Sequence, residues 1–227
     1  MGASVVGPVL PEGEPAAGPW HDAAVAELLE LLERSGVPGD RPRVVAVDGR
    51  GGSGKTTLAA RLAGAVARSS VVHTDDVAWH HSFFDWTELM ADGILRPARD
   101  GRAVSYRPRA WGDRGRLGAI EVPAGTQWLF IEGVGAGRRE LAGLLDAILW
   151  VQSDVEAAEQ RGIARDVEQG VNGDHDQATL FWHEWQAEEL PFVRDQRPWE
   201  RADAVVAGVG LRQPAADHVL LAPAPTP

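Results

Sequence analysis

The 227 residues carry a formal net charge of −11 and include no cysteine. A chain without cysteine has no disulfide framework, thiolate zinc site or cysteine nucleophile, and the acidic balance argues against nonspecific nucleic-acid binding. The length suits one α/β domain with a sizeable core. The N-terminus shows no signal-peptide pattern, and no stretch approaches the roughly 18 apolar residues of a membrane span. We therefore expect a cytoplasmic protein without a membrane partner.

The first part of the chain contains clear strand and helix patterns. Residues 1–19, with four prolines and four glycines, are expected to form a flexible arm. Apolar residues at helical spacing predict an amphipathic helix at 20–35. Apolar β-branched runs and an Ala/Leu-rich pattern then predict a strand at 43–48, a helix at 55–68 and a strand at 71–74.

Residues 77–120 are less regular, and their glycines and aromatic residues suggest an insertion that faces a substrate. A helix is expected there at 87–94 and a strand at 103–107. The regular pattern then resumes, and the tail 213–227 is expected to be flexible. Strands that alternate with helices predict a single domain, residues 20–212, with a mostly parallel sheet, helices on both faces and ligand at the strands' carboxyl ends. The later strands are expected at 127–132, 147–151 and 204–207, and the later helices at 138–145, 154–169 and 176–190.

The stretch Gly49-Arg50-Gly51-Gly52-Ser53-Gly54-Lys55-Thr56 fits the phosphate-binding pattern G-x-x-x-x-G-K-[ST]. Its glycines let the backbone N–H groups surround a phosphate, and the helix that follows directs its positive end at the same phosphate. Lys55 is the only lysine among 22 basic residues. The alternative is a glycine turn that only joins a strand to a helix. The residues expected to bind ATP are Gly49, Gly51, Gly52, Ser53, Gly54, Lys55, Thr56 and Thr57.

Carboxylates follow two of the expected strands. Asp75 and Asp76 come just after strand 71–74, where a carboxylate could take a proton from an acceptor hydroxyl. Asp75 is the expected base, and Asp76 is expected to support the turn, the substrate or Mg²⁺, although the sequence leaves open which of the two is the base. A helix cap is the alternative for either. Glu132 ends strand 127–132 and is expected to hold Mg²⁺ together with the hydroxyl of Thr56, although a purely structural role stays open.

Two arginines lie four residues apart on the expected helix 154–169. Arg161 and Arg165 would share one helical face and could neutralise charge on the transferring phosphate. The segment 151–201 contains 12 acidic residues and 5 arginines, so an exposed helix with ion pairs is the alternative. The histidines lack the spacing of a helical zinc site.

The aromatic residues of the insertion suggest a wall for a planar acceptor. Ordinary packing is the competing explanation for such residues. The expected acceptor-binding residues are Asp76, Trp79, Asp85, Trp86, Tyr106, Arg107 and Trp111.

The chain resembles the uridine kinase and nicotinamide riboside kinase group over roughly residues 43–207. The resemblance rests on the phosphate loop and on residues 71–76, 130–133 and 161–166, in that order. It implies a three-layer P-loop NTPase fold, a base at Asp75 and a lid over 154–172. Residues 75–79 and 106–111 depart from the group's acceptor motifs, and the lid has one fewer arginine than is usual in the group. These departures affect the expected identity of the acceptor more than the expected phosphoryl transfer.

These features predict an ATP- and Mg²⁺-dependent small-molecule kinase that acts on a hydroxyl of a nucleoside-like acceptor. The rival hypotheses are a kinase of another hydroxylated metabolite, such as a sugar or antibiotic, and a nucleotide-binding regulator without an acceptor. The sequence leaves open the choice of ATP or GTP, and whether the protein forms a homo-oligomer.

Overall fold

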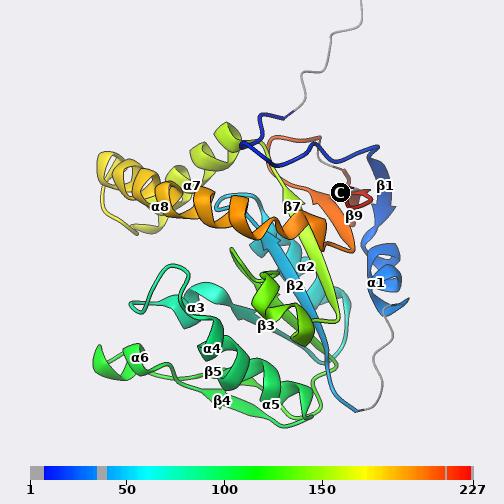
Figure 1. Cartoon of the computed structure of the whole chain (residues 1–227), viewed down its shortest axis with the longest axis vertical. Helices are drawn as coiled ribbons and strands as arrows, with labels where there is room; N and C mark the ends of the chain where they lie inside the picture. The colour runs from blue at the N-terminus through cyan, green and yellow to red at the C-terminus, as the bar shows by residue number, and fades with distance from the viewer. Residues whose placement is uncertain (1–7, 35–39, 213, 226–227) are drawn as a thin grey trace, which may run out of the picture.

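The computed structural model describes residues 8–34, 40–212 and 214–225. A seven-stranded sheet with the order β1-β9-β8-β7-β2-β6-β3 forms its centre (Figure 1). Strands β8, β7, β2, β6 and β3 are parallel, and β9 and β1 continue the sheet antiparallel. These strands are β1 (His21–Ala24), β2 (Arg43–Gly49), β3 (Ser69–His73), β6 (Trp128–Glu132), β7 (Ala147–Gln152), β8 (Ala204–Ala207) and β9 (His218–Ala222). A separate pair joins β4 (Val104–Tyr106) and β5 (Ile120–Val122).

Helices cover both faces of this sheet because successive strand residues point to opposite sides. Val45 and Val47 pack with α1 and α2, whereas Val44 and Ala46 pack with the helices that follow β3 and with the end of α8. The three-layer α/β architecture expected from the sequence is confirmed. The helices are α1 (Val25–Arg34), α2 (Lys55–Ala65), α3 (Thr74–Ala78), α4 (Thr87–Met90), the π-helix η1 (Ala91–Leu95), α5 (Arg96–Arg99), α6 (Arg109–Asp113), the 3₁₀-helix η2 (Arg139–Leu144), α7 (Val155–Gln169), α8 (His175–Gln196) and the 3₁₀-helix η3 (Pro198–Glu200).

Both ends of the chain differ from the flexible segments that composition suggested. Glu14 is buried and accepts hydrogen bonds from Trp150 Nε1 at 2.8 Å and Gln152 Nε2 at 2.9 Å. In the tail, β9 forms part of the sheet and pairs with β8 and β1. Residues 1–7, 213 and 226–227 of these expected segments lie outside the described residues. The expectation failed because these contacts join distant segments, whereas composition reflects only local preference.

Other boundaries shift in ways that matter for the site. The expected helix 20–35 starts as strand β1, and its last residue lies outside the described part of the chain. The expected helix 87–94 becomes the continuous run α4, η1 and α5. Helix α8 begins with a capping box at Asp174 and extends through Pro191 to Gln196, six residues beyond the expected end at Leu190. This longer helix crosses the sheet close to the phosphate loop (Figure 1).

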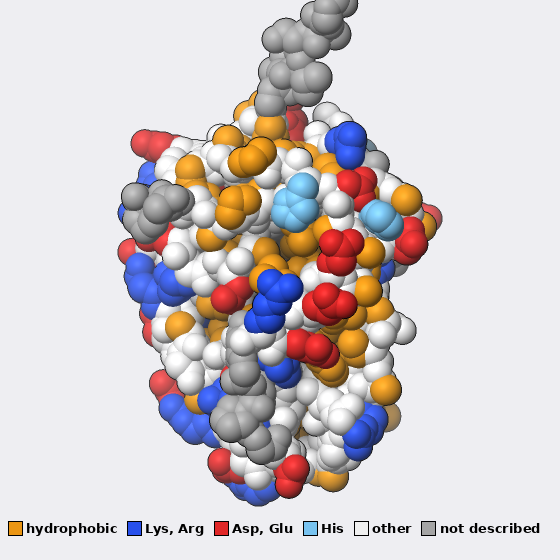
Figure 2. Space-filling model, turned by 90° about the vertical axis from the view of Figure 1, so that its right-hand side faces the viewer, with side chains coloured by type: hydrophobic (Ala, Val, Ile, Leu, Met, Phe, Trp, Pro, Cys, Tyr) orange, Lys and Arg blue, Asp and Glu red, His pale blue; other side chains and the backbone are white. Residues whose placement is uncertain are grey.

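The surface near α1 and β1 carries a mixture of side chains. Acidic, basic and apolar side chains are interspersed among the described residues of this face (Figure 2). Among the described residues, no helix is both long and apolar enough to cross a membrane.

Candidate active site

The phosphate loop lies between the end of β2 and the start of α2, as its sequence predicts. Gly52 and Gly54 have φ angles of 70° and 105°, a region that glycine adopts without steric cost. A Cβ at Gly52 would lie 2.1 Å from the carbonyl oxygen of Ala158, so α7 can approach the loop only because this position is glycine. The loop is therefore shaped by backbone requirements that its glycines meet.

Two polar side chains of the loop suit a bound phosphate. Lys55 Nζ donates to the carbonyl oxygen of Arg50 at 3.2 Å, so its ammonium lies over the loop. The hydroxyl of Ser53 is buried and has no hydrogen-bond partner among the described residues. A nucleotide phosphate would provide an acceptor for both groups, and this supports the expected nucleotide site.

A cavity of about 190 Å³ continues from the loop toward the end of β8. Gly54, Thr57, Arg161 and Val209 are among the residues that line it. The carbonyl oxygen of Ser53 accepts a hydrogen bond from Val209 N at 3.0 Å, which ties this cavity wall to the loop. The cavity offers space for the part of a nucleotide that extends beyond its phosphates.

The two expected carboxylates lie at the ends of neighbouring strands. His73 of β3 pairs in register with Glu132 of β6, and their Nδ1 and Oε2 atoms are 2.6 Å apart. Thr56 Oγ1 donates to Glu132 Oε1 at 3.2 Å. Burial would raise the pKa of Glu132, but the His73 hydrogen bond, the charges of Lys55 and His73 and the Thr56 hydrogen bond together lower it. The same hydrogen bond to Glu132 raises the pKa of His73.

Thr56 and Glu132 form the donor set expected for Mg²⁺. A hydroxyl and an ionised carboxylate suit this hard cation, which typically takes one or two protein ligands and completes its shell with phosphates and water. The described residues contain no cluster of three or more His, Asp or Glu that could hold a metal by itself. The arrangement therefore fits Mg²⁺ carried by a nucleotide.

Asp75 lies in the first turn of α3, directly after β3. The residue is accessible to solvent, yet surrounding protein partly desolvates the carboxylate and raises its pKa. Lys55 lowers this pKa, Glu132 raises it, and His73 and Arg165 lower it further. Asp75 thus lies close enough to Lys55 and Glu132 for both charges to shift its pKa.

Asp76, the next residue, belongs to a different environment. Its Oδ1 accepts from Arg116 Nη2 at 2.5 Å, and its carbonyl oxygen accepts from Trp111 Nε1 at 2.9 Å. The Arg116 guanidinium in turn lies 3.6 Å from the centre of the Trp111 ring. Asp76 therefore anchors the insertion, in line with the structural role that the sequence left open for it.

The two lid arginines lie on α7 beside the phosphate loop. Arg161 Nη2 donates to Thr57 Oγ1 at 3.3 Å, at the mouth of the 190 Å³ cavity. Arg165 forms an ion pair with Asp166 at 2.7 Å, yet its charge also acts on Asp75. Arg165 therefore forms an ion pair, as the alternative interpretation of this helix expects, and it also lies near the candidate base Asp75. Its catalytic role stays a prediction.

Two of the expected acceptor-binding tryptophans are buried, which corrects the sequence interpretation. Trp86 is 1% exposed, and the Arg138 guanidinium covers its ring at 3.7 Å. Trp111 is 5% exposed beneath Arg116. Their aromatic surface is used for packing, so neither ring offers a free face to an acceptor.

The other expected acceptor residues are spread along the insertion. Trp79 is partly buried next to Arg116, and Tyr106 packs over Gly93. Arg107 donates to the carbonyl oxygen of Arg116 at 2.7 Å, and Asp85 is exposed. Trp79 and Arg107 thus share Arg116 as a partner with Asp76 and Trp111, and their role in acceptor binding stays a prediction.

An aromatic cluster that the sequence did not predict lies nearer the loop. Phe83, which is 43% exposed, packs edge-on against Trp185 at 5.1 Å, and Phe84 stacks on Phe192 at 4.1 Å. Trp185 also approaches Gly51, because a Cβ there would lie 3.1 Å from its Nε1. Only the length and path of α8 bring these residues together, so no local sequence signal marks them.

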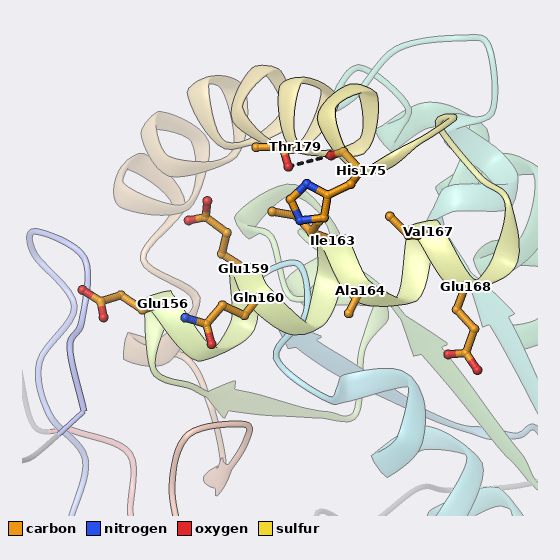
Figure 3. Close-up of a pocket in the computed structure, with 9 residues that line it drawn as sticks. All are labelled: Glu156, Glu159, Gln160, Ile163, Ala164, Val167, Glu168, His175 and Thr179. Atoms are coloured by element: carbon orange, nitrogen blue, oxygen red, sulfur yellow. Dashed lines mark hydrogen bonds between the residues drawn. The ribbon is translucent and has the colours of Figure 1, made fainter.

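A larger hollow, of about 790 Å³, lies between α7 and α8 (Figure 3). Ile163, Val167 and His175 are among its lining residues, and Glu156, Glu159 and Glu168 surround them. No phosphate-loop residue lines this hollow, and neither does Asp75 or Glu132. We therefore place the candidate site at the loop and not in the larger space.

No family model matches the chain, and no curated protein matches it either. Among solved structures, a candidate fructose transport system kinase from Silicibacter sp. TM1040 has a TM-score of 0.56 at 22% identity, over 77% of this chain and 94% of its own. A candidate uridine kinase from Bacillus stearothermophilus has a TM-score of 0.46 at 18% identity, over 79% of this chain and 98% of its own. The chain therefore shares its three-layer α/β fold with the Silicibacter structure.

Proposed function

We propose that the protein is an ATP-dependent kinase that transfers the γ-phosphoryl group to a hydroxyl of a small-molecule acceptor. One observation carries this proposal: the candidate base Asp75 and the candidate metal ligand Glu132 both lie near Lys55 of the phosphate loop. The Lys55 charge acts on the pKa of both Asp75 and Glu132. A regulator that only hydrolyses nucleotide does not require a carboxylate at the position of Asp75.

The chain's own residues have distinct roles in this transfer. The loop N–H groups and Lys55 bind the donor phosphates, and Asp75 accepts the proton of the acceptor hydroxyl. The acceptor oxygen forms a bond to the γ-phosphorus as the bond to the β–γ bridging oxygen breaks, so ADP leaves. Bound through Thr56 and Glu132, Mg²⁺ would neutralise phosphate charge. His73 helps keep Glu132 ionised for that role.

The lid would contribute positive charge where the transferring group becomes most anionic. Arg161 lies at the nucleotide cavity, and Arg165 lies close to Asp75. Charge stabilisation of this kind is the main protein contribution to phosphoryl transfer, because the transition state is loose and requires little covalent help.

The acceptor is a compound with a free hydroxyl, and a nucleoside-like molecule is the first candidate. The partly exposed Phe83 and Trp185 lie close to the loop and could contact a planar or apolar face of such an acceptor. The Silicibacter neighbour is named for fructose transport, so sugars belong beside nucleosides among the candidates.

A screen with purified protein tests the proposal. MgATP or MgGTP would be combined with panels of nucleosides, sugars and amino alcohols, and both nucleoside diphosphate release and phosphorylated product would be measured. We expect product with at least one class, and none with Lys55→Ala. Slow hydrolysis that no acceptor accelerates, without any phosphorylated product, would favour a nucleotide-binding regulator instead.

A further inference from the structure

Helix α8 places a carboxylate directly on the phosphate loop. Glu189 Oε1 accepts a hydrogen bond from the backbone N–H of Gly51 at 2.6 Å, and the residue is 2% exposed. The indole rings of Trp182 and Trp185 also lie close to Gly51, 3.0 and 3.1 Å from the position of an ideal Cβ there. A buried carboxylate therefore uses an N–H group of the loop that is expected to bind phosphate.

The charged side chains near Glu189 show where this residue lies relative to the expected binding site of the nucleotide phosphates. Lys55 and Arg50 of the loop segment both act on its carboxylate, and Arg50 is itself 3.5 Å from Glu14. On α8, the Trp185 indole contributes a hydrogen bond. Because Lys55 is expected to hold the terminal phosphates, Glu189 lies on the side of the loop where those phosphates would bind.

The carboxylate is also costly to keep ionised in this position. Burial raises the pKa of Glu189 despite the opposing effects of the Gly51 hydrogen bond, the charges of Lys55 and Arg50, and Trp185. A terminal phosphate would add negative charge nearby and compete for the same N–H group. Each effect favours a protonated Glu189 in the nucleotide complex.

We propose that Glu189 is a specificity-determining residue that competes with the terminal phosphate for Gly51 and couples its binding to the uptake of one proton. In the free protein the Gly51 N–H donates to Glu189. When ATP is bound it donates to the terminal phosphate, and Glu189 carries a proton. After transfer the diphosphate no longer occupies this position, and Glu189 returns to Gly51. This inference rests on the proposed nucleotide site.

The sign of the pH dependence follows from linkage. An anion that raises the pKa of Glu189 is bound together with a proton, so ATP affinity is highest at low pH. Affinity falls as pH rises above the pKa of Glu189 in the free protein, which itself lies above its ordinary value of 4.5. The fall approaches about tenfold per pH unit for one linked proton, and MgADP should show less of it.

Isothermal titration calorimetry on the full chain tests the proposal. MgATP and MgADP would be titrated across pH in buffers of different ionisation enthalpy, which gives both affinity and proton uptake. Glu189→Gln keeps an oxygen for the Gly51 N–H but cannot take up a proton, and Glu188→Gln removes the same charge from an exposed neighbour. Titration of the nucleotide itself is common to all variants, so differences between them isolate Glu189.

We expect wild type and Glu188→Gln to take up more protons with MgATP than with MgADP. Glu189→Gln should lose this difference and bind MgATP several-fold more tightly at high pH. Equal proton uptake and equal pH slopes in the two Gln variants would overturn the proposal. Should Glu189→Gln not fold, Trp185→Phe provides the test: losing the indole hydrogen bond should move the fall in affinity to higher pH, and an unmoved profile would overturn the coupling. If wild type binds MgATP no better than Lys55→Ala, the proposed function itself fails.

Discussion

The phosphate loop and the insertion between α3 and β5 meet at the same edge of the sheet, but they use their polar groups differently. In the loop, the Ser53 hydroxyl and the Lys55 ammonium have little or no side-chain pairing. The tryptophan rings of the insertion are covered by cations: Arg116 lies on Trp111, and Arg138, which follows β6, lies on Trp86. These two side chains of the loop remain available to a ligand, whereas the two tryptophan rings of the insertion are covered by arginines.

Adjacent residues mark the boundary between these two regions. The pKa of Asp75 responds to the charges of Lys55 and Glu132, whereas Asp76 pairs with Arg116 of the insertion. A shift of one residue along α3 thus separates the proposed base from a group that pairs with the insertion. Variants on each side of this boundary should therefore have separable effects on transfer and stability.

The largest effect is expected at the loop. Lys55→Ala should lower phosphoryl transfer by at least about 10²–10³-fold, since loss of one preorganised donor at developing charge costs this much. Turnover and nucleotide affinity would be measured together with the thermal unfolding midpoint, which should change little. Lys55→Arg keeps the positive charge but replaces the compact ammonium with a planar guanidinium, so it should recover only part of the phosphoryl-transfer activity. Unchanged affinity and turnover in Lys55→Ala would show that the loop is not a phosphate site.

The next effect is expected at the boundary itself. Asp75→Asn keeps the shape of the side chain but removes the base, so acceptor phosphorylation should fall by roughly 10²–10⁴-fold. The lower end is expected because the transition state is loose. The matched variant Asp76→Asn should cost much less turnover and at most about 1 kcal/mol of stability, since its ion pair is partly exposed. The opposite order, measured by product formation at saturating ATP, would exchange the two roles.

A smaller effect is expected in the lid. Arg161→Ala and Arg165→Ala should each lower kcat by about 10- to 100-fold, the equivalent of one charged hydrogen bond, and weaken ground-state ATP binding less. Gln160→Ala is a control because Gln160 lines the outer hollow of the same helix. Steady-state kinetics would check the split between kcat and affinity. If both arginine variants match the control, they belong to the solvated ion-paired face.

The smallest effect is expected within the insertion. Trp111→Phe removes the hydrogen bond to the Asp76 carbonyl oxygen but keeps a ring beneath Arg116. Unfolding in urea should show a loss of about 1 kcal/mol, with ATP affinity unchanged. A variant that keeps its stability but changes its acceptor preference would restore the acceptor-binding role first predicted for Trp111.

The sequence predicts what depends on local backbone requirements. The loop glycines and the strand ends fix where Lys55, Asp75 and Glu132 lie, and the described strands β2, β6, β7 and β8 fall within about one residue of their expected ranges. The contacts that local patterns missed join distant positions. Gly51 and Glu189 are 138 residues apart, and nothing in the sequence near Glu189 distinguishes it from its exposed neighbour Glu188. Burial of Trp86 and Trp111 was missed because composition cannot show which rings a cation will cover.

The pairing of β1 with β9 has a consequence for synthesis on the ribosome. Asp22 and His218 in these strands are 196 residues apart, and β1 has no other partner strand in the described sheet. Strand β1 therefore emerges almost 200 residues before its partner β9 is made. By then β2, β3, β6, β7 and β8 have all emerged and can pair with one another. A nascent chain could thus hold nucleotide on a formed loop while one sheet edge is still open, and the bound nucleotide would stabilise that intermediate.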